Sequence, residues 1–394
     1  MTDSPIAGDA AALLEGAVEA LPEGRLAEQM AGTRPMRVKL GIDPTAPDIH
    51  LGHVVVLTKL RQFQDAGHVV VLIIGDYTAR VGDPSGRAVE RPVLTDDEID
   101  AHARTFQEQA FSVLDPERTE VRRNGEWLAM SSDELFRLVR RFTVARLLER
   151  DEFSRRMAAS EPISILELLY PVLQGYDSVA VEADVEVGGT DQKFNLLFGR
   201  DVQESLGVPP QSILTMPILP GTDGVRRMSK SLGNYVGVTD PPEEMFGKLM
   251  SIPDDVMGEY YRLLLYEPLD PDRHPGEAKR ELARRLVARF HGGAAATVAE
   301  GRFDRVHVRH EVPEEVRAVR VEPGADGEVH LPGLIASAFE VSTSEARRLL
   351  SQGGVKVDGQ ALDGGRLDVP MVELEGKVLQ VGKRRFVRLV GGSS

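Results

Sequence analysis

Hydrophobic and polar positions change their period along the first part of the chain, and the change predicts a strand, a helix and a second strand. Residues 36–42 alternate like a half-buried strand, residues 50–66 repeat apolar side chains at helical spacing, and residues 69–74 are apolar throughout. A continuous apolar strand is typical of a parallel sheet that is covered on both faces. The order therefore predicts a βαβ unit with a right-handed crossover, preceded by an amphipathic helix over residues 9–31.

The pattern in the rest of the chain divides it into several parts. Apolar segments that would extend the sheet domain are separated from charge-rich helical stretches, and prolines and glycines gather shortly before the C-terminal region. The predicted parts are an α/β domain with a parallel sheet over residues 1–238, a helical insertion in it at about 95–160, a helical domain over 239–312, a linker over 313–332 and a small α+β domain over 333–394.

Composition narrows the class of protein. The chain has 394 residues, a hydrophobic fraction of 42% and no cysteine, which excludes disulfides, thiol catalysis and cysteine-ligated zinc. The sequence shows neither a long apolar run nor a secretory leader, so it predicts a cytoplasmic protein without a membrane segment. A net charge of −15 argues against general affinity for nucleic acid, although residues 333–394 are net positive. An RNA partner would have to meet local basic patches.

Two short motifs far apart in the chain carry the candidate chemistry. In the first, His50 and His53 flank Gly52 at the start of a helix, where free N–H groups and the helix dipole favour anions. The two imidazoles share one face, and the glycine leaves room for a flat base. In the second, Arg227 and Lys230 lie on a basic loop whose cations repel one another unless an anion joins them. Together the motifs indicate a two-sided grip on a nucleoside triphosphate, whereas either one alone is more simply a helix start or a solvated loop.

A buried polar stripe is expected on one apolar helix. Tyr170, Gln174 and Asp177 are spaced so that they share a stripe among apolar neighbours. Since an unpaired buried carboxylate is costly, Asp177 indicates either an internal partner or a polar ligand with an amine or hydroxyl. Gly189 permits close backbone approach beside Asp191, which could accept from ribose hydroxyls, and an ordinary turn is the alternative there.

These motifs resemble those of class I aminoacyl-tRNA synthetases. The histidine pair and the basic loop are similar to the two signatures of that class. Segments 43–46, 82–86, 173–177 and 188–192 resemble the bacterial tyrosyl-tRNA synthetase family. The resemblance implies that the parallel-sheet domain is a Rossmann-like catalytic domain.

The resemblance also implies roles for the matching residues. Tyrosine would contact Lys39, Asp43, Asp83, Tyr170, Gln174, Asp177 and Gln192, with Asp177 accepting from the phenol hydroxyl. ATP would contact Thr45, His50, Gly52, His53, Gly189 and Asp191, and Arg87, Arg91, Arg227 and Lys230 would close on the pyrophosphate. Two departures stand out: Lys39 occupies the place of a tyrosine in the better-known branch of the family, and Arg227 the place of a usual lysine.

The C-terminal residues resemble the small RNA-binding domain named after ribosomal protein S-four. A helix capped by Ser342 and a strand from Gly354 are expected there. The residues that would contact RNA are Arg347, Arg348 and Lys356, with further charge from Lys383, Arg384, Arg385 and Arg388. A solvated domain without RNA is the alternative.

The family resemblance implies an enzyme. Tyrosine would react with ATP, as its Mg²⁺ complex, to give tyrosyl-adenylate and pyrophosphate, and the tyrosyl group would then pass to the terminal ribose of tRNA(Tyr). A homodimer is implied, and no structural metal is expected. Two alternatives stay open: a tryptophanyl-tRNA synthetase, which shares the fold and signatures, and a non-catalytic RNA-binding protein on a retired synthetase scaffold.

Overall fold

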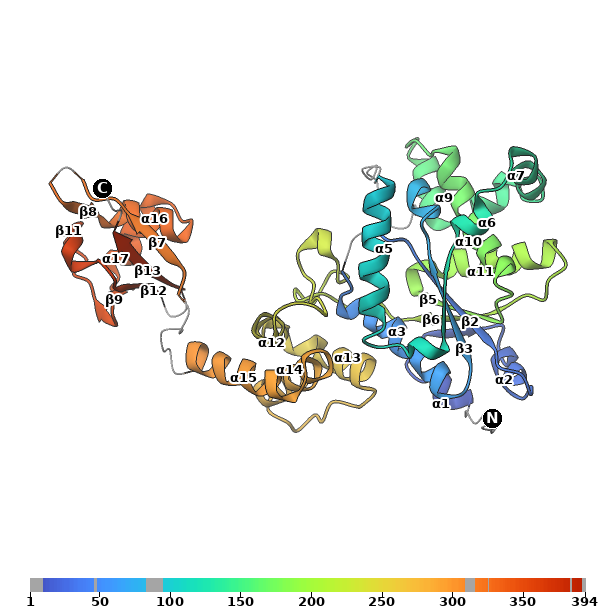
Figure 1. Ribbon diagram of the computed structural model, residues 1–394, viewed down its shortest axis with the longest axis horizontal. Helices are drawn as coiled ribbons and strands as arrows, with labels where there is room; N and C mark the ends of the chain where they lie inside the picture. Colours follow the sequence, from blue (N-terminus) through green and yellow to red (C-terminus); the bar gives the residue numbers. More distant parts are fainter. Residues whose placement is uncertain are drawn as a thin grey trace. The chain divides into compact units, whose positions relative to one another are not determined.

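The chain forms two compact units. The computed structural model describes residues 10–45, 48–82, 95–308, 316–324, 326–382 and 385–391. One unit comprises residues 1–241 and 248–283, and the other comprises residues 242–247 and 284–394. Figure 1 shows the elements of each.

The first unit is built on a six-stranded sheet with the order β1-β6-β5-β2-β3-β4. The strands are β1 (Glu19–Leu21), β2 (Arg37–Ile42), β3 (Val69–Ile74), β4 (Thr119–Arg123), β5 (Val185–Gly189) and β6 (Ser212–Met216). All neighbouring strands are parallel except β1, which runs antiparallel to β6. The prediction of an α/β domain with a parallel sheet is confirmed.

The predicted βαβ unit consists of β2, α3 (Leu51–Asp65) and β3. The apolar stripe of α3 is buried, and β3 is buried along nearly its whole length. Helix α3 packs against β3 and β5. Gly67 follows two residues after the last residue of α3, and its φ of 92° favours glycine.

Further helices surround the sheet (Figure 1). They are α4 (Thr78–Val81), α5 (Asp96–Ala110), α6 (Gly125–Leu128), α7 (Ser132–Val139), α8 (Val144–Leu147), α9 (Asp151–Ala158), α10 (Ile165–Ala180) and α11 (Lys193–Ser205), with short 3₁₀ turns at Pro116–Arg118, Thr190–Gln192 and Lys230–Leu232. Helix α10 begins at a capping box formed by Ser164 and Glu167, and it packs along α11. Pro171 lies within its first two turns.

Two expectations for this unit are wrong. Residues 9–31 do not form one helix but α1 (Ala10–Leu14), β1 and α2 (Arg25–Met30). Gly16 and Gly24 have positive φ between these elements, and Pro22 has no N–H to continue a helix. Residues 95–160 are mostly helical, as expected, but they also supply β4, which pairs in parallel with β3 and so belongs to the sheet.

Residues 242–308 carry helices, in agreement with the pattern. These are α12 (Pro242–Ser251), a 3₁₀ turn (Asp254–Val256), α13 (Met257–Tyr260), a π-helical turn (Tyr261–Leu265), α14 (Pro275–His291), α15 (Gly293–Phe303) and a second π-helical turn (Asp304–Val308).

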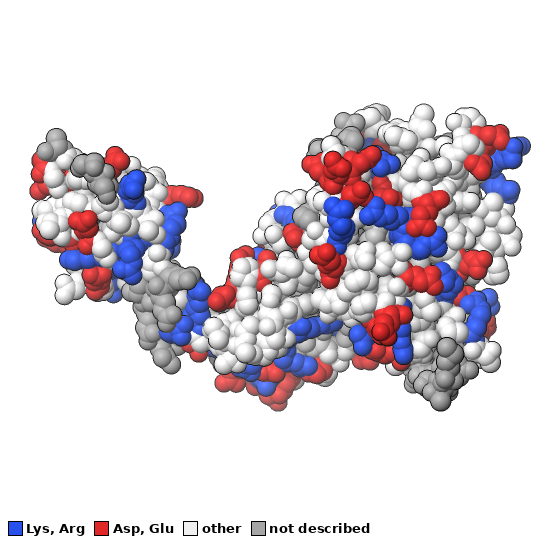
Figure 2. Space-filling view, viewed as in Figure 1, with Lys and Arg blue, Asp and Glu red and all other residues white. Residues whose placement is uncertain are grey.

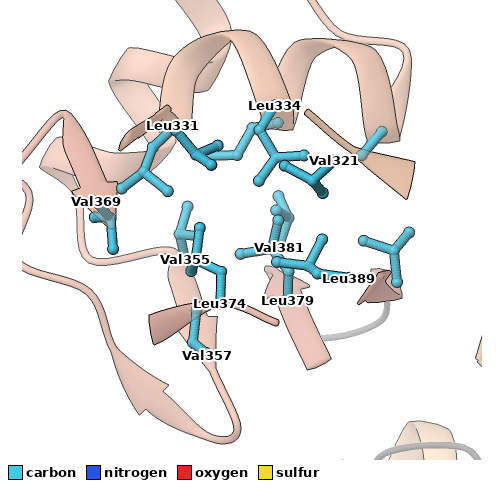
Figure 3. Close-up of a cluster of buried hydrophobic side chains, with 14 of the residues drawn as sticks. Val321, Leu331, Leu334, Val355, Val357, Val369, Leu374, Leu379, Val381 and Leu389 are labelled. Carbon is cyan, nitrogen blue, oxygen red and sulfur yellow. The ribbon is translucent and has the colours of Figure 1, made fainter. Parts of the chain in front are cut away.

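The C-terminal residues form a small α+β fold, as predicted. Its elements are β7 (Ala318–Val321), β8 (Glu328–His330), α16 (Leu331–Phe339), α17 (Thr343–Ser351), β9 (Val355–Val357), β10 (Gln360–Ala361), β11 (Asp368–Pro370), a 3₁₀ turn (Met371–Glu373), β12 (Val378–Val381) and β13 (Arg385–Gly391). Five strands pair in the order β10-β9-β12-β13-β7, and β8 pairs with β11. Strands β7 and β8 fall within the expected linker 313–332, so part of that stretch is paired into this fold. Its core lies between α16 and the strands, where Figure 3 shows Leu331 and Leu334 facing Val355, Val381 and Leu389.

Charged side chains of both signs are interspersed over the visible face of each unit (Figure 2). None of the helices in the described part of the chain combines the length and apolar character that a bilayer-spanning segment needs.

Candidate active site

A pocket of about 620 Å³ opens at the carboxyl ends of the central strands of the first unit. Strand β2 pairs with β3 on one side and with β5 on the other, so the chain order reverses there. Ligands of open α/β sheets bind at such a switch point. Sequence-predicted residues that line the pocket are Asp43, Thr45, His50, Gly52, His53, Tyr170, Gln174, Asp177, Gly189, Asp191, Gln192, Arg227 and Lys230. The structure therefore brings together most of the predicted site.

The two histidines are fixed by the start of α3. Their rings stack with centroids 3.9 Å apart. His50 Nδ1 accepts from the backbone N–H of Gly52 at 3.1 Å, and His53 Nδ1 accepts from the backbone N–H of His50 at 3.2 Å. Burial lowers the pKa of His50 well below its usual value and that of His53 to about 4, so both rings are neutral near pH 7. With Nδ1 occupied as an acceptor, each ring carries its proton on Nε2 and can donate there to a ligand.

Gly52 leaves space for the ring of His50, besides any space that it leaves for a nucleotide base. A Cβ at this position would lie 2.9 Å from the ring atoms Cε1 and Nδ1 of His50. The glycine therefore allows the histidine to fold back onto the first turn of its own helix.

The basic loop lies against the histidine motif because the chain that follows it pairs with the start of α3. Leu51 N–H donates to Val236 O at 3.0 Å, and Val238 N–H donates to Ile49 O at 2.9 Å. Within the loop, Asn234 Oδ1 accepts from the backbone N–H of Ser229 at 2.9 Å. These backbone contacts hold the loop beside the N-terminus of α3.

Two cations of the loop reach carboxylates of the pocket. Lys230 Nζ lies 2.6 Å from Asp48 Oδ2, and Arg227 Nη1 lies 3.3 Å from Asp191 Oδ2. The hydrogen bond from Lys230 holds the pKa of Asp48 below its usual value. Both ion pairs are partly exposed to solvent. The phosphates of a triphosphate could therefore replace the two carboxylates as partners of the cations, with little change in the number of ion pairs.

Asp43 joins the end of β2 to two helices. Its Oδ1 accepts from Thr78 Oγ1 at 2.6 Å, and its Oδ2 accepts from the Tyr170 hydroxyl at 2.9 Å. A Cβ at Gly75 would collide with both Asp43 and Thr78, so a glycine is needed where β3 passes this carboxylate. The Tyr170 hydroxyl, which comes from α10, is thereby held beside the end of β2 in the pocket lining.

Asp177 is a buried acidic group that lines the pocket. Trp127 Nε1 donates to its Oδ1 at 2.8 Å, and Asn124 Nδ2 donates to its Oδ2 at 3.4 Å. Burial raises the pKa of this carboxyl to about 7, against the opposing effects of Lys39 and of the two hydrogen bonds. The carboxylate can thus accept from a ligand hydroxyl and changes charge near neutral pH.

Lys39 lies behind the pocket wall instead of lining it. Its side chain is fully buried, and its ammonium is 2.9 Å from Glu186 Oε1. Glu186, which was not predicted, does line the pocket. Lys39 is therefore not placed to contact a ligand in this pocket directly, whereas its partner Glu186 is in the pocket lining.

The remaining predicted residues divide by position. Asp83, Arg87 and Arg91 lie outside the described residues. In the second unit, Arg347 and Lys356 are exposed on α17 and β9, whereas Arg348 pairs with Glu345 at 2.6 Å. Lys383 and Arg384 also lie outside the described residues. Over the described ranges, His, Asp and Glu form no group of three or more that could hold a metal ion.

Several residues in or beside the pocket are not indicated by the sequence pattern. Asn124, which lines the pocket, and Trp127, which donates to Asp177, follow β4, and Trp127 is the single tryptophan of the chain. A strand followed by Asn-Gly and a lone tryptophan was the available signal. Asp48 and Glu186 gave no signal beyond their charge, because their partners lie far away in the sequence.

The geometry agrees with comparisons to known proteins. A family model described as "tRNA synthetases class I (W and Y)" matches residues 30–307. The chain belongs to this family. The matched residues include both signature motifs and the whole lining of the pocket.

Relatives in this synthetase family are similar over nearly their full length. The tyrosine–tRNA ligase of Moorella thermoacetica is 50% identical over 394 residues, which cover 96% of this chain and 94% of the relative. That of Thermotoga maritima is 48% identical over 396 residues, 97% of each chain. The similarity therefore extends beyond the catalytic unit to the C-terminal fold.

Solved synthetase structures share the fold. The tyrosyl-tRNA synthetase of Archaeoglobus fulgidus, solved as a complex with L-tyrosine, has a TM-score of 0.61 at 24% identity and covers 74% of this chain and 99% of its own. A C-terminally truncated mitochondrial enzyme of Aspergillus nidulans has a TM-score of 0.62 at 21% identity, with 74% and 91% covered. At these identities the likeness concerns the fold alone.

Proposed function

We propose that this synthetase joins tyrosine to tRNA(Tyr) in two steps. Tyrosine first reacts with ATP to give tyrosyl-adenylate and pyrophosphate, and the tyrosyl group then passes to the terminal ribose of the tRNA. The observation that carries the choice of tyrosine is Asp177, a buried carboxylate with two fixed donors and room for a ligand hydroxyl. The names of the relatives agree with this choice.

The pocket offers a place for each part of the two substrates. The phenol would meet Asp177, and the amino and carboxylate groups would meet Tyr170, Gln174 and Gln192, with Asp83 as a further expected contact. The ribose would meet Gly189 and Asp191, the aminoacyl group Asp43, and the phosphates Thr45, His50 and His53. Arg227 and Lys230, with Arg87 and Arg91 expected to join them, would close on the pyrophosphate.

Adenylate formation requires that the two substrates are held in position and that the charge developing on the phosphates is stabilised. The tyrosine carboxylate attacks the α-phosphorus, the bond to the β-phosphate oxygen breaks, and pyrophosphate leaves with the electron pair. No protein nucleophile takes part. Neutral imidazoles that donate through Nε2 suit a phosphate as it gains charge, because they need no change of protonation. The two loop cations would leave Asp48 and Asp191 to pair with the departing pyrophosphate.

Magnesium, oligomeric state and location complete the proposal. ATP would enter as its Mg²⁺ complex, with the ion held largely through phosphate oxygens and water. A homodimer is supported by large apolar side chains exposed on neighbouring segments of the catalytic unit, since such surfaces commonly mark interfaces. These side chains are Phe136, Val144, Met157, Ile165 and Leu166. The cytoplasm is the proposed location.

We also propose that the C-terminal fold binds tRNA through Arg347 and Lys356, in a domain that includes β7 and β8. The double variant Arg347→Ala/Lys356→Ala should raise the KM for tRNA by about tenfold or more and flatten its salt dependence by about two charges, because phosphate contacts are lost. Tyrosine-dependent pyrophosphate exchange should not change. Aminoacylation kinetics over a salt series measure both effects.

Arg366→Ala is the matched control for this variant, because Arg366 is also exposed in the same fold but pairs with Glu373 at 3.0 Å. It should leave the KM for tRNA within about twofold of wild type. An equal effect of both variants would contradict specific RNA contacts by Arg347 and Lys356.

Pyrophosphate exchange with tyrosine, with tryptophan and with no amino acid tests the proposed function. Exchange that requires tyrosine supports it. Exchange that requires tryptophan would assign the chain to the other branch of the family, and absence of exchange with either would indicate a non-catalytic scaffold.

A further inference from the structure

The ammonium of Lys39 is held by three groups in a site closed to solvent. It lies 2.9 Å from Glu186 Oε1, donates to Ser178 Oγ at 2.7 Å and donates to the backbone oxygen of Gln174 at 3.1 Å. The side chain of Lys39 is 0% exposed and that of Glu186 is 2% exposed. The three donors of the ammonium are therefore all engaged, two of them on α10.

Glu186, on β5, links Lys39 to residues of the pocket through further hydrogen bonds. Its Oε1 accepts from Gln174 Nε2 at 3.3 Å, and its Oε2 accepts from Ser178 Oγ at 3.2 Å. Gln211 Nε2 donates to Oε2 as well. Gln174 is thus held at two points, by Lys39 at its backbone oxygen and by Glu186 at its side-chain amide.

A buried ion pair is weak evidence for stability. Desolvation of two charges commonly offsets their attraction, and apolar replacements of similar volume are often as stable. Glu186 nevertheless lines the pocket, and both members of the pair contact α10, whose residues Gln174 and Asp177 also line it. The place of the pair suggests a role in what α10 presents to the ligand.

We propose that Lys39 and Glu186 act as a positioning pair for tyrosine selection, which fixes Gln174 and sets the charge of Asp177, with Lys39 acting from behind the pocket wall and Glu186 from within it. This inference rests on the proposed function. The proposal assigns the discrimination between tyrosine and phenylalanine to the opposite charges of Lys39 and Glu186 as well as to Asp177 itself.

The electrostatics of Asp177 give the proposal a directional signature. The charged groups that act on this carboxyl are Lys39 from β2, which lowers its pKa, and Glu186 from β5, which raises it. Loss of the lysine charge should therefore favour the protonated form of Asp177, and loss of the glutamate charge should favour the ionised form. Since an ionised carboxylate accepts from the phenol, the KM for tyrosine should rise as the pH falls through the pKa of Asp177.

The test is tyrosine-dependent pyrophosphate exchange by the full chain over a pH series, with Lys39→Met and Glu186→Gln. Lys39→Met should raise the KM for tyrosine by about tenfold near neutral pH and move the rise in KM to higher pH by about one pH unit. Glu186→Gln, which keeps the size and an acceptor, should move it to lower pH. The KM for ATP should stay within about twofold of wild type in both.

Two further variants separate a positioning role from a structural one. Lys39→Met/Glu186→Gln removes both charges and should return the pH profile close to that of wild type, even if the single lysine variant folds poorly. Lys59→Met is the matched control, because Lys59 is equally buried but donates to the backbone oxygens of Leu13 and Glu15 and is not among the residues that line the pocket. It should not change the pH profile for tyrosine.

The outcomes distinguish the inference from the function on which it rests. Opposite displacements of the two single variants support the positioning pair. Profiles that coincide with wild type, or that change only in kcat, would overturn it while tyrosine-dependent exchange by the wild type left the proposed function intact. Loss of tyrosine dependence in the wild type would overturn the proposed function instead.

Discussion

Lys230→Ala is expected to lower kcat for adenylate formation by about 10²–10³-fold and to change the KM for ATP by less than about threefold. In the free enzyme Lys230 is paired with Asp48 at 2.6 Å, so binding of ATP in the ground state replaces one anionic partner with another. The attraction grows only as negative charge develops on the departing pyrophosphate. Pre-steady-state measurement of adenylate formation at varied ATP concentration gives the two parameters separately.

Arg226→Ala is the matched control for this prediction. Arg226 is the neighbouring cation of the same loop, but it pairs with Asp223 at 2.9 Å within the loop and does not line the pocket. Its removal should change kcat by less than about threefold. A large rise in the KM for ATP with unchanged kcat in Lys230→Ala would show that Lys230 binds the ground state, contrary to the account.

Asp177→Ala is expected to collapse the preference for tyrosine over phenylalanine. A site built around a substrate hydroxyl leaves buried groups unpaired when that hydroxyl is missing, and tyrosyl-tRNA synthetases are the known example, at about 10⁵-fold for the family. Under the proposed function, Asp177 is the carboxylate that would provide that selection, and Trp127 and Asn124 hold its orientation. The ratio of kcat/KM for the two amino acids in pyrophosphate exchange should fall by at least about 10³-fold.

The stability of the isosteric variant Asp177→Asn checks that the loss of tyrosine preference is a functional effect. The pKa of Asp177 is raised to about 7 from an ordinary value of 3.8, so the native state binds more protons between these values and its stability falls as pH rises through them. Asp177→Asn lacks this dependence. The Tm of Asp177→Asn minus the Tm of wild type should therefore increase as the pH rises from about 4 to about 7. Strong rejection of phenylalanine by Asp177→Ala would contradict the assignment of Asp177.

The local hydrophobic pattern was sufficient to predict pocket residues where one short segment both forms a helix or strand and carries the functional side chains. The period change over β2, α3 and β3 places His50 and His53 at a helix N-terminus, and the spacing of Tyr170, Gln174 and Asp177 is that of one face of α10. The pocket brings these together because the strands are parallel and their carboxyl ends share one edge.

What the sequence did not reveal depends on pairing between distant residues. Lys39 and Glu186 are separated by more than the whole βαβ unit, so neither residue type indicated that the charges cancel in the core. The strand β4 is short and charged, with no fully buried residue, and its register with β3 brings Trp127 near Asp177. Likewise Pro22 and two glycines outweighed the helical periodicity of residues 9–31.

A crystal structure with a non-reactive tyrosyl-adenylate analogue would locate the amino acid and the nucleotide in one experiment. The phenol oxygen should lie within hydrogen-bond distance of Asp177, the ribose hydroxyls should meet Asp191, and the Nε2 atoms of His50 and His53 should face the nucleotide. An analogue bound elsewhere in the chain, with both imidazoles and Asp177 left uncontacted, would contradict this placement of the two substrates.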